Sequence, residues 1–227
     1  MLGKAAVAMW WDIAPEMKAE FEDWHSHEHM PERLAIPGFL RGTRWIALSG
    51  APSYFVMYEL SRSATMTAGP YLARLNDPTP WSKKMMPQHR NMVRSLCRVR
   101  ASFGGGVALA LATLRFSPSP RKARSLSAWL VGDVMPALPA RKGVIAAHLL
   151  QALPMAGRPQ TAEQKIRGGD AVADWVLLAG AYDAGAIRAL LEGELAAESL
   201  AAHGALPDIV TAIYSPAYCL VPKDLVT

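Results

Sequence analysis

The stretch WHSHEHMP at residues 24–31 has a counterpart 105 residues further along the chain, WLVGDVMP at residues 129–136. The same ungapped offset also aligns Pro15 with Pro120. Pairs of tryptophan and proline at a single offset are hard to obtain by chance. The pattern therefore predicts that the chain is a tandem duplication.

The predicted units are residues 1–104 and 107–227, joined at Gly104-Gly105-Gly106, which has no side chains and should be a flexible joint. Alternating apolar residues, prolines and glycines divide each unit into six elements. In the first unit these are a strand at Ala5–Asp12, a helix from Pro15 to about Pro31, strands at Arg41–Ser49 and Ser53–Leu60, a broken helical region at Thr67–His89, and a strand at Asn91–Phe103. In the second they are a strand at Val107–Phe116, a helix from Pro120, strands at Val144–Leu153 and Trp175–Tyr182, a helix at Ala184–His203, and a strand at Asp208–Val221.

The order strand, helix, strand, strand, helix, strand predicts an α+β fold made of two ferredoxin-like βαββαβ repeats. Each antiparallel sheet would carry both of its helices on one face, so the other face must be buried elsewhere. We expect the two sheets to pack face to face about a pseudo-twofold axis. The polar stretch Pro154–Asp174 is expected to be a mobile loop inserted in the second unit.

Composition narrows the class of protein. Of the 227 residues, 51% are hydrophobic, which is enough for a folded core. No apolar run reaches the roughly 20 residues that cross a bilayer, and the first residues lack the pattern of a signal peptide. Cys97 and Cys219 cannot form a disulfide framework in a chain of this size. We expect a cytoplasmic protein without a membrane partner.

The residues Trp24–Arg33, followed by Ile36-Pro37-Gly38-Phe39, resemble the first helix and turn of EthD-like proteins. Two fused ferredoxin-like units also resemble the dimeric α/β-barrel superfamily, to which the EthD-like proteins belong. The resemblance implies a one-chain barrel that binds a small organic molecule. One hypothesis for the function is a cofactor-independent enzyme that acts by acid–base chemistry on an aromatic or polyketide-like compound. The alternative is a non-catalytic binding or structural protein.

The candidate catalytic residues are His25, Glu28 and His29 on the first helix. An imidazole beside a carboxylate can exchange protons near neutral pH. The offset of 105 replaces the two histidines by Leu130 and Val134, so the first unit would carry the site and the second would lack it.

Other interpretations of the same helix stay open. Because Asp133 corresponds to Glu28, the carboxylate could be structural, accepting backbone N–H groups at the helix end. The spacing His25-x-x-Glu28-His29 matches inverted zinc peptidases, which need a much larger chain. A metal on His25, His29 and Glu32, or a haem on either histidine, is a further alternative, although neither a metal nor a cofactor is our expectation. Trp24 and its counterpart Trp129 should both be buried.

The predicted pocket lies between the sheet and the first helix. Its apolar wall would be formed by Trp11, Trp45 and Tyr58. Arg41 and Arg44 would hold a carboxylate or enolate oxygen of the ligand, or else form salt bridges with Glu28 or Glu32.

A basic stretch runs from Pro78 to Gly132 without any acidic residue, within a chain of net charge +5. A basic patch by itself recognises nothing, so we expect these side chains to be solvated. Phe55-Val56-x-Tyr58 resembles part of an RNA-reading strand, but Tyr54 stands where that motif needs a small residue. Nucleic acid is therefore not the expected partner. The sequence leaves open a monomer with pseudo-twofold symmetry and a homodimer.

Overall fold

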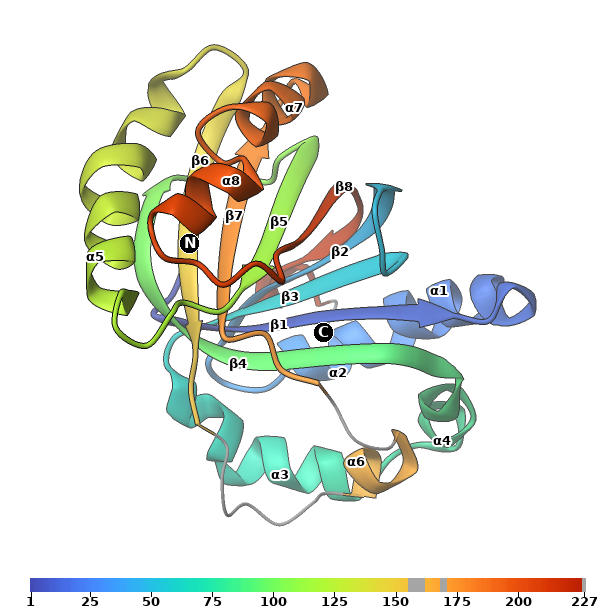
Figure 1. Cartoon of the computed structure of the whole chain (residues 1–227). Coiled ribbons are helices and arrows are strands. Elements are labelled where there is room, and N and C mark those ends of the chain that lie inside the picture. Colours follow the sequence, from blue (N-terminus) through green and yellow to red (C-terminus); the bar gives the residue numbers. More distant parts are fainter. Residues whose placement is uncertain (155–161, 168–170, 226–227) are drawn as a thin grey trace.

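The computed structural model describes residues 1–154, 162–167 and 171–225. Its strands form one closed antiparallel barrel in the order β1-β3-β2-β8-β5-β7-β6-β4 (Figure 1). The strands are β1 (Ala5–Ile13), β2 (Phe39–Ser49), β3 (Tyr54–Leu60), β4 (His89–Gly104), β5 (Ala110–Phe116), β6 (Val144–Ala152), β7 (Trp175–Ala181) and β8 (Val210–Leu220). The α+β class is confirmed.

The barrel is closed by hydrogen bonds between strands that are far apart in the sequence. β2 pairs with β8, with Gly42 opposite Leu220, and β4 pairs with β6, with Cys97 opposite Ala152. The strand pattern predicts two sheets packed face to face, and the family resemblance implies a one-chain barrel. The structure shows the two sheets joined along both edges. An unpaired edge strand leaves a row of backbone N–H and C=O groups without partners. Closing the barrel pairs these edge strands with each other within the chain.

Strand alternation divides the buried residues between the two faces of the barrel wall. In β1, Ala6, Ala8 and Trp10 belong to the cluster inside the barrel. Val7, Met9 and Trp11 belong to a second cluster, which lies between the outer face and the helices of the first half. A third cluster fills the same position in the second half.

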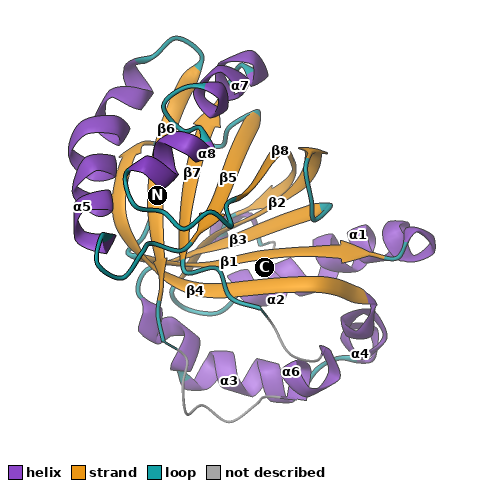
Figure 2. Cartoon of the chain, in the orientation of Figure 1, coloured by secondary structure: helices purple, strands orange, loops and turns teal. Residues whose placement is uncertain are grey.

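The helices lie outside the barrel (Figure 2). They are α1 (Lys18–Trp24), α2 (Met30–Leu34), α3 (Gly69–Asn76), α4 (Pro80–Met85), α5 (Ala123–Ala128), α6 (Ala162–Arg167), α7 (Ala184–Glu192) and α8 (Ala197–Ala202). Helical turns of the 3₁₀ type add Pro15–Met17, Ser63–Thr67, Met86–Gln88, Met135–Ala140 and Pro222–Asp224. The single helix expected at Ala184–His203 is interrupted at Gly193. No helix among the described residues is long and apolar enough to cross a membrane.

Two connections differ from expectation. Gly104 is the last residue of β4 and adopts a φ of 67°, and a Cβ there would lie 2.0 Å from the carbonyl oxygen of Ile145. The start of the glycine joint is thus a packed strand end. The polar insert expected to be a loop contains α6, which lies beside α3 of the first half (Figure 1). Residues 155–161 and 168–170 of that insert lie outside the described residues.

The two tryptophans of the repeated stretch differ in burial. Trp24 is 0% exposed, as expected. Trp129 is only partly buried and stacks on His203, with ring centroids 3.7 Å apart. The prediction that both rings are buried is therefore wrong for Trp129, where Leu130 takes the buried position instead.

Candidate functional site

The histidine-rich stretch forms a π-helical turn, His25–His29, between α1 and α2. A π-turn holds more residues than an α-turn and rotates the residues that follow it relative to a regular helix. His25, Glu28, His29 and Glu32 therefore do not share one environment, although their spacing predicts one helix side. A second π-turn occurs at Trp129–Val134, so the turn itself is a feature of both halves.

His25 is enclosed by aromatic rings and is 1% exposed. The ring centroids of Phe21 and Trp11 lie 5.4 and 6.2 Å from its own. Burial, together with the nearby Arg44 guanidinium, holds the pKa of His25 well below its ordinary value. Arg44 Nη1 lies 3.3 Å from His25 Nδ1, and a guanidinium can only donate, so Nδ1 is the acceptor. His25 is therefore a neutral imidazole inside the wall, and it does not line the cavity described below.

Glu28 connects this helical segment to α4. Its Oε1 accepts hydrogen bonds from Trp24 Nε1 at 3.0 Å, from Thr79 Oγ1 at 2.5 Å and from Ser82 Oγ at 3.2 Å. If Glu28 had the structural role considered above, its carboxylate would accept hydrogen bonds from backbone N–H groups. The donors in the structure are side chains instead. Asp133, its counterpart in the second half, is exposed. The environment of Glu28 is thus not shared by the two halves.

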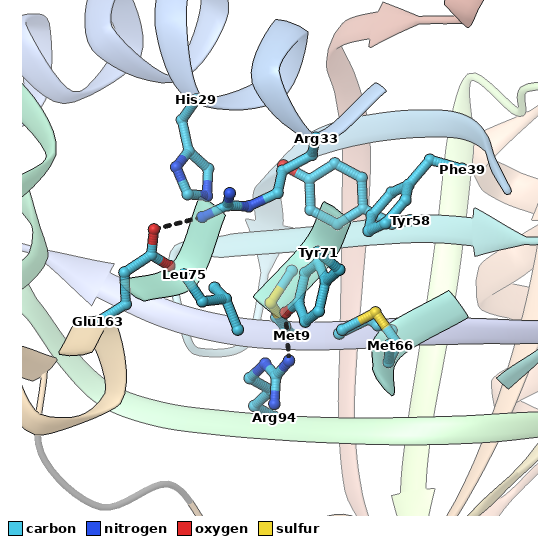
Figure 3. Close-up of a pocket in the computed structure, with 11 residues that line it drawn as sticks. Met9, His29, Arg33, Phe39, Tyr58, Met66, Tyr71, Leu75, Arg94 and Glu163 are labelled. Atoms are coloured by element: carbon cyan, nitrogen blue, oxygen red, sulfur yellow. Dashed lines mark hydrogen bonds and ion pairs between the residues drawn. The ribbon is translucent and has the colours of Figure 1, made fainter. Parts of the chain in front are cut away.

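A cavity of about 40 Å³ lies between the outer face of the sheet and α2 (Figure 3). A volume of this size holds about three or four water molecules at roughly 10–15 Å³ each. The apolar part of its lining consists of Val7, Met9, Phe39, Met66 and Leu75, and the polar part consists of His29, Arg33, Tyr58, Tyr71, Arg94 and Glu163. The cavity thus combines apolar side chains with convergent polar groups, as small-molecule sites do, although its polar share is large.

Arg33 and Glu163 form a buried ion pair at one side of the cavity. Arg33 Nη2 lies 2.5 Å from Glu163 Oε1, and the two side chains are 3% and 4% exposed. Burial by itself would lower the pKa of Arg33, but the Glu163 carboxylate and the nearby Tyr71 reverse this, and the net shift is upward. Glu163 belongs to α6, so the second half of the chain contributes to a cavity expected to belong to the first half alone.

Two buried polar atoms that border the cavity have no hydrogen-bond partner among the described residues. They are Arg33 Nη1 and the Tyr58 hydroxyl. Burial raises the pKa of Tyr58, so its phenol remains protonated and able to donate. Buried donors of this kind normally bind an ordered water or a ligand. Each of the two groups can donate a hydrogen bond to an oxygen atom that carries negative charge.

The opposite side of the cavity is formed by Arg94 and Tyr71. Arg94 Nη2 donates to the Tyr71 hydroxyl at 3.1 Å, and the guanidinium of Arg33 lies 5.9 Å from the Tyr71 ring centroid. Figure 3 shows His29 and Arg33 reaching into the cavity from the helix and Arg94 from β4. The cavity is therefore bordered by cationic side chains on two sides.

The other residues predicted for the pocket lie elsewhere. Trp45 faces the barrel interior and stacks on Phe55, and Arg41 pairs with the buried Glu59. Both were expected on the helix side, but the alternation of β2 directs them to the opposite face. Trp11 lies on the helix side beside His25, yet it does not border the cavity.

Arg44 also lies apart from the cavity. Besides His25, its Nη1 donates to the carbonyl oxygen of Glu22 at 3.1 Å. The alternative of salt bridges from Arg41 and Arg44 to Glu28 or Glu32 is wrong, because Arg41 pairs with Glu59 and Arg44 donates to the Glu22 carbonyl oxygen. Glu32 instead accepts from Arg74 Nη1 at 3.2 Å.

Four polar residues of the cavity were missed by the sequence reading: Arg33, Tyr71, Arg94 and Glu163. Arg33 stands four residues after His29, so helical spacing could have indicated it. Glu163 carries no local signal, because it lies 130 residues from its partner in an insert. Among the described residues, no three His, Cys, Asp or Glu side chains are arranged to hold a metal ion, which disfavours the set His25, His29 and Glu32.

The second half carries apolar residues at the corresponding positions. The offset of 105 places Leu130 at His25, Val134 at His29 and Leu138 at Arg33. Leu130 and Leu138 are 0% and 1% exposed and belong to the core of that half. The polar groups that the first helical segment contributes to the cavity, His29 and Arg33, therefore have apolar counterparts in the second half.

No known protein family and no curated protein matches this sequence. Solved structures do match. An anthrone oxidase-like protein has a TM-score of 0.67 and 10% identity, over 98% of this chain and 94% of that chain. A candidate monooxygenase from Lactobacillus acidophilus has a TM-score of 0.61 and 6% identity, over 97% of each chain. One from Fusobacterium nucleatum has a TM-score of 0.58 and 8% identity, over 96% of this chain and 95% of that chain.

The structural neighbours are ferredoxin-like proteins of the dimeric α/β-barrel type, and this chain shares their fold. At these identities the likeness concerns the fold alone, since one fold carries many functions. The chemistry of this chain must be argued from its own cavity.

Proposed function

We propose that this protein binds a small aromatic or polyketide-like compound in the cavity beside Arg33 and acts on it by acid–base chemistry. The observation that carries the proposal is the pair of buried donors without partners, Arg33 Nη1 and the Tyr58 hydroxyl, beside His29. The presence of anthrone oxidase-like and monooxygenase-type proteins among the structural neighbours agrees with this substrate class.

The proposed step is removal of a proton from a position conjugated to a ligand carbonyl. The imidazole of His29 accepts the proton, and the C–H electron pair forms a new C=C bond. The carbonyl π electrons move to the oxygen, which becomes an enolate or phenolate. Arg33 and Tyr58 donate hydrogen bonds to that oxygen, and donors that are already in place lower the barrier. His25 and Glu28 orient the helix that carries His29.

A ring-sized ligand needs more space than the about three or four water molecules that this cavity can hold. Met9 and Met66 line the cavity, and methionine adapts its rotamers to irregular shapes at low cost. We therefore expect the apolar wall to rearrange on binding while the donors keep their positions.

We also infer that the chain is a fused pair of EthD-like units, residues 1–104 and 107–227. Two observations support this. The first half orders its strands β4-β1-β3-β2 and the second orders them β8-β5-β7-β6, which is the same sequence of positions. The π-turns begin at residues 25 and 129, close to the offset of the repeat.

The test uses anthrone, whose methylene hydrogens exchange with deuterium when the carbonyl enolises. NMR in D₂O measures both binding and the rate of exchange, without any oxidant. We expect the wild type to accelerate exchange and His29→Val, which copies Val134, to abolish the acceleration. The control is His27→Val, since His27 is exposed on the same turn. Binding without accelerated exchange would establish the non-catalytic alternative, and absence of binding would refute the proposal altogether.

A further inference from the structure

The ion pair between Arg33 and Glu163 uses only part of the guanidinium. Glu163 Oε1 contacts Nη2, whereas Nη1 has no partner among the described residues. A guanidinium presents a planar fork that two oxygen lone pairs fill best. The carboxylate of Glu163 therefore leaves a buried donor of Arg33 unused.

The charges around the cavity favour an anion. Arg33 and Arg94 both border it, and Glu163 is the acidic member of the described lining. If the Glu163 carboxylate were withdrawn from Arg33, a buried cation would remain without compensation, which costs several kcal/mol in a protein interior. An anionic ligand oxygen would restore that compensation and would also reach the Tyr58 hydroxyl.

Glu163 reaches the cavity from a short helix. α6 has six residues, and besides the ion pair Ala162 N donates a hydrogen bond to Asn76 Oδ1 of the first half, at 3.2 Å. A buried ion pair adds little net stability, because its attraction is offset by the desolvation of both groups. A ligand anion can therefore compete with Glu163 on nearly equal terms.

We propose that Glu163 occupies the place of an anionic ligand oxygen on Arg33, so that the cavity selects ionised phenols, enolates or carboxylates and Glu163 competes with them. This inference rests on the proposed function and specifies its substrate class. On this inference Glu163 determines how tightly the ligand binds. The cavity then recognises the charge of the ligand more than its shape.

The probe is 4-nitrophenol, whose phenolate absorbs visible light, compared with 4-nitroanisole, which has a similar shape and cannot ionise. In the wild type we expect the phenolate to bind about tenfold more tightly than the anisole, equivalent to ~1.4 kcal/mol. Glu163→Gln should tighten phenolate binding by about a further tenfold, because the competing charge is gone, and should leave the anisole unchanged. The control is Glu194→Gln, which removes an exposed carboxylate paired with Arg141.

Equal binding of the two probes by the wild type would overturn the inference. This comparison needs no variant, so it tests the inference even if Glu163→Gln fails to fold. No gain of phenolate affinity in a folded Glu163→Gln protein would also overturn it. Neither result would affect the proposed function if deuterium exchange of anthrone still depends on His29. Failure of both probes and of anthrone to bind would refute both proposals.

Discussion

Trp24 and Trp129 provide a matched pair of substitutions at equivalent positions of the two halves. Trp24 is 0% exposed, and its Nε1 donates to Glu28 at 3.0 Å. Replacing it by alanine should cost about 4–5 kcal/mol, since large core truncations cost about 3–5 kcal/mol and a hydrogen bond to a charged group is lost as well. Trp129 is partly buried, and the space it leaves opens to water. Trp129→Ala should therefore cost only about 1–2 kcal/mol.

Urea unfolding followed by circular dichroism measures both costs, and variants with unchanged m-values can be compared directly. Trp24→Phe separates the two contributions, because it keeps a buried ring and removes the indole N–H. We expect its cost to be intermediate, at about 2 kcal/mol. Equal costs for the two alanine variants would refute the reasoning, since they would show that the stacked ring of Trp129 contributes as much as a fully buried one.

Three further outcomes follow from the buried polar groups. Arg33→Leu copies Leu138, the residue at the same offset in the second half. It should lower the free energy of unfolding by urea by about 3–5 kcal/mol, because it leaves Glu163 buried without its cation. The double variant that also carries Glu163→Leu should recover most of that loss. Tyr58→Phe should change the unfolding free energy by less than about 1 kcal/mol, because the hydroxyl has no partner among the described residues, yet calorimetry should show weaker binding of 4-nitrophenolate. Burial lowers the pKa of His148 to about 3 and also lowers the pKa of His25. Below about pH 6.5 these two histidines therefore bind protons in the unfolded chain that they do not bind in the folded protein. The free energy of unfolding should therefore be fully retained above about pH 6.5. Between about pH 6.5 and 5 it should fall by up to about 1.4 kcal/mol per pH unit for each histidine. His148→Asn should make the free energy of unfolding depend less steeply on pH in this range.

Much of the fold could be predicted because its signals are local. The short apolar runs of β1 and β3, and the prolines and glycines near their ends, depend on neighbours along the chain. The expected strands Ala5–Asp12 and Ser53–Leu60 differ from the observed ones by one residue at one end. The π-turn at His25–His29 could not be predicted in this way, because an inserted residue in a helical turn leaves no distinct pattern of side chains.

The candidate site could be predicted only in part. His29 and Tyr58 were named from the sequence and line the cavity, whereas Trp45 and Arg41 face the barrel interior. Alternation divides a strand into two faces, but it does not say which face meets the helices when both are buried. In a barrel both faces are buried, so polarity gives no guide to the choice.

By itself, the sequence determined the class of fold, the order of its strands and the difference between a histidine-bearing half and an apolar half. Only the tertiary structure decided which strands pair along the two seams of the barrel, β2 with β8 and β4 with β6, and that Arg33 meets Glu163. The physical reason is that edge pairing and ion-pair formation depend on which distant segments the folded chain brings together. Arg33 and Glu163 are 130 residues apart, and neither position shows its partner until the barrel has placed α6 beside α3.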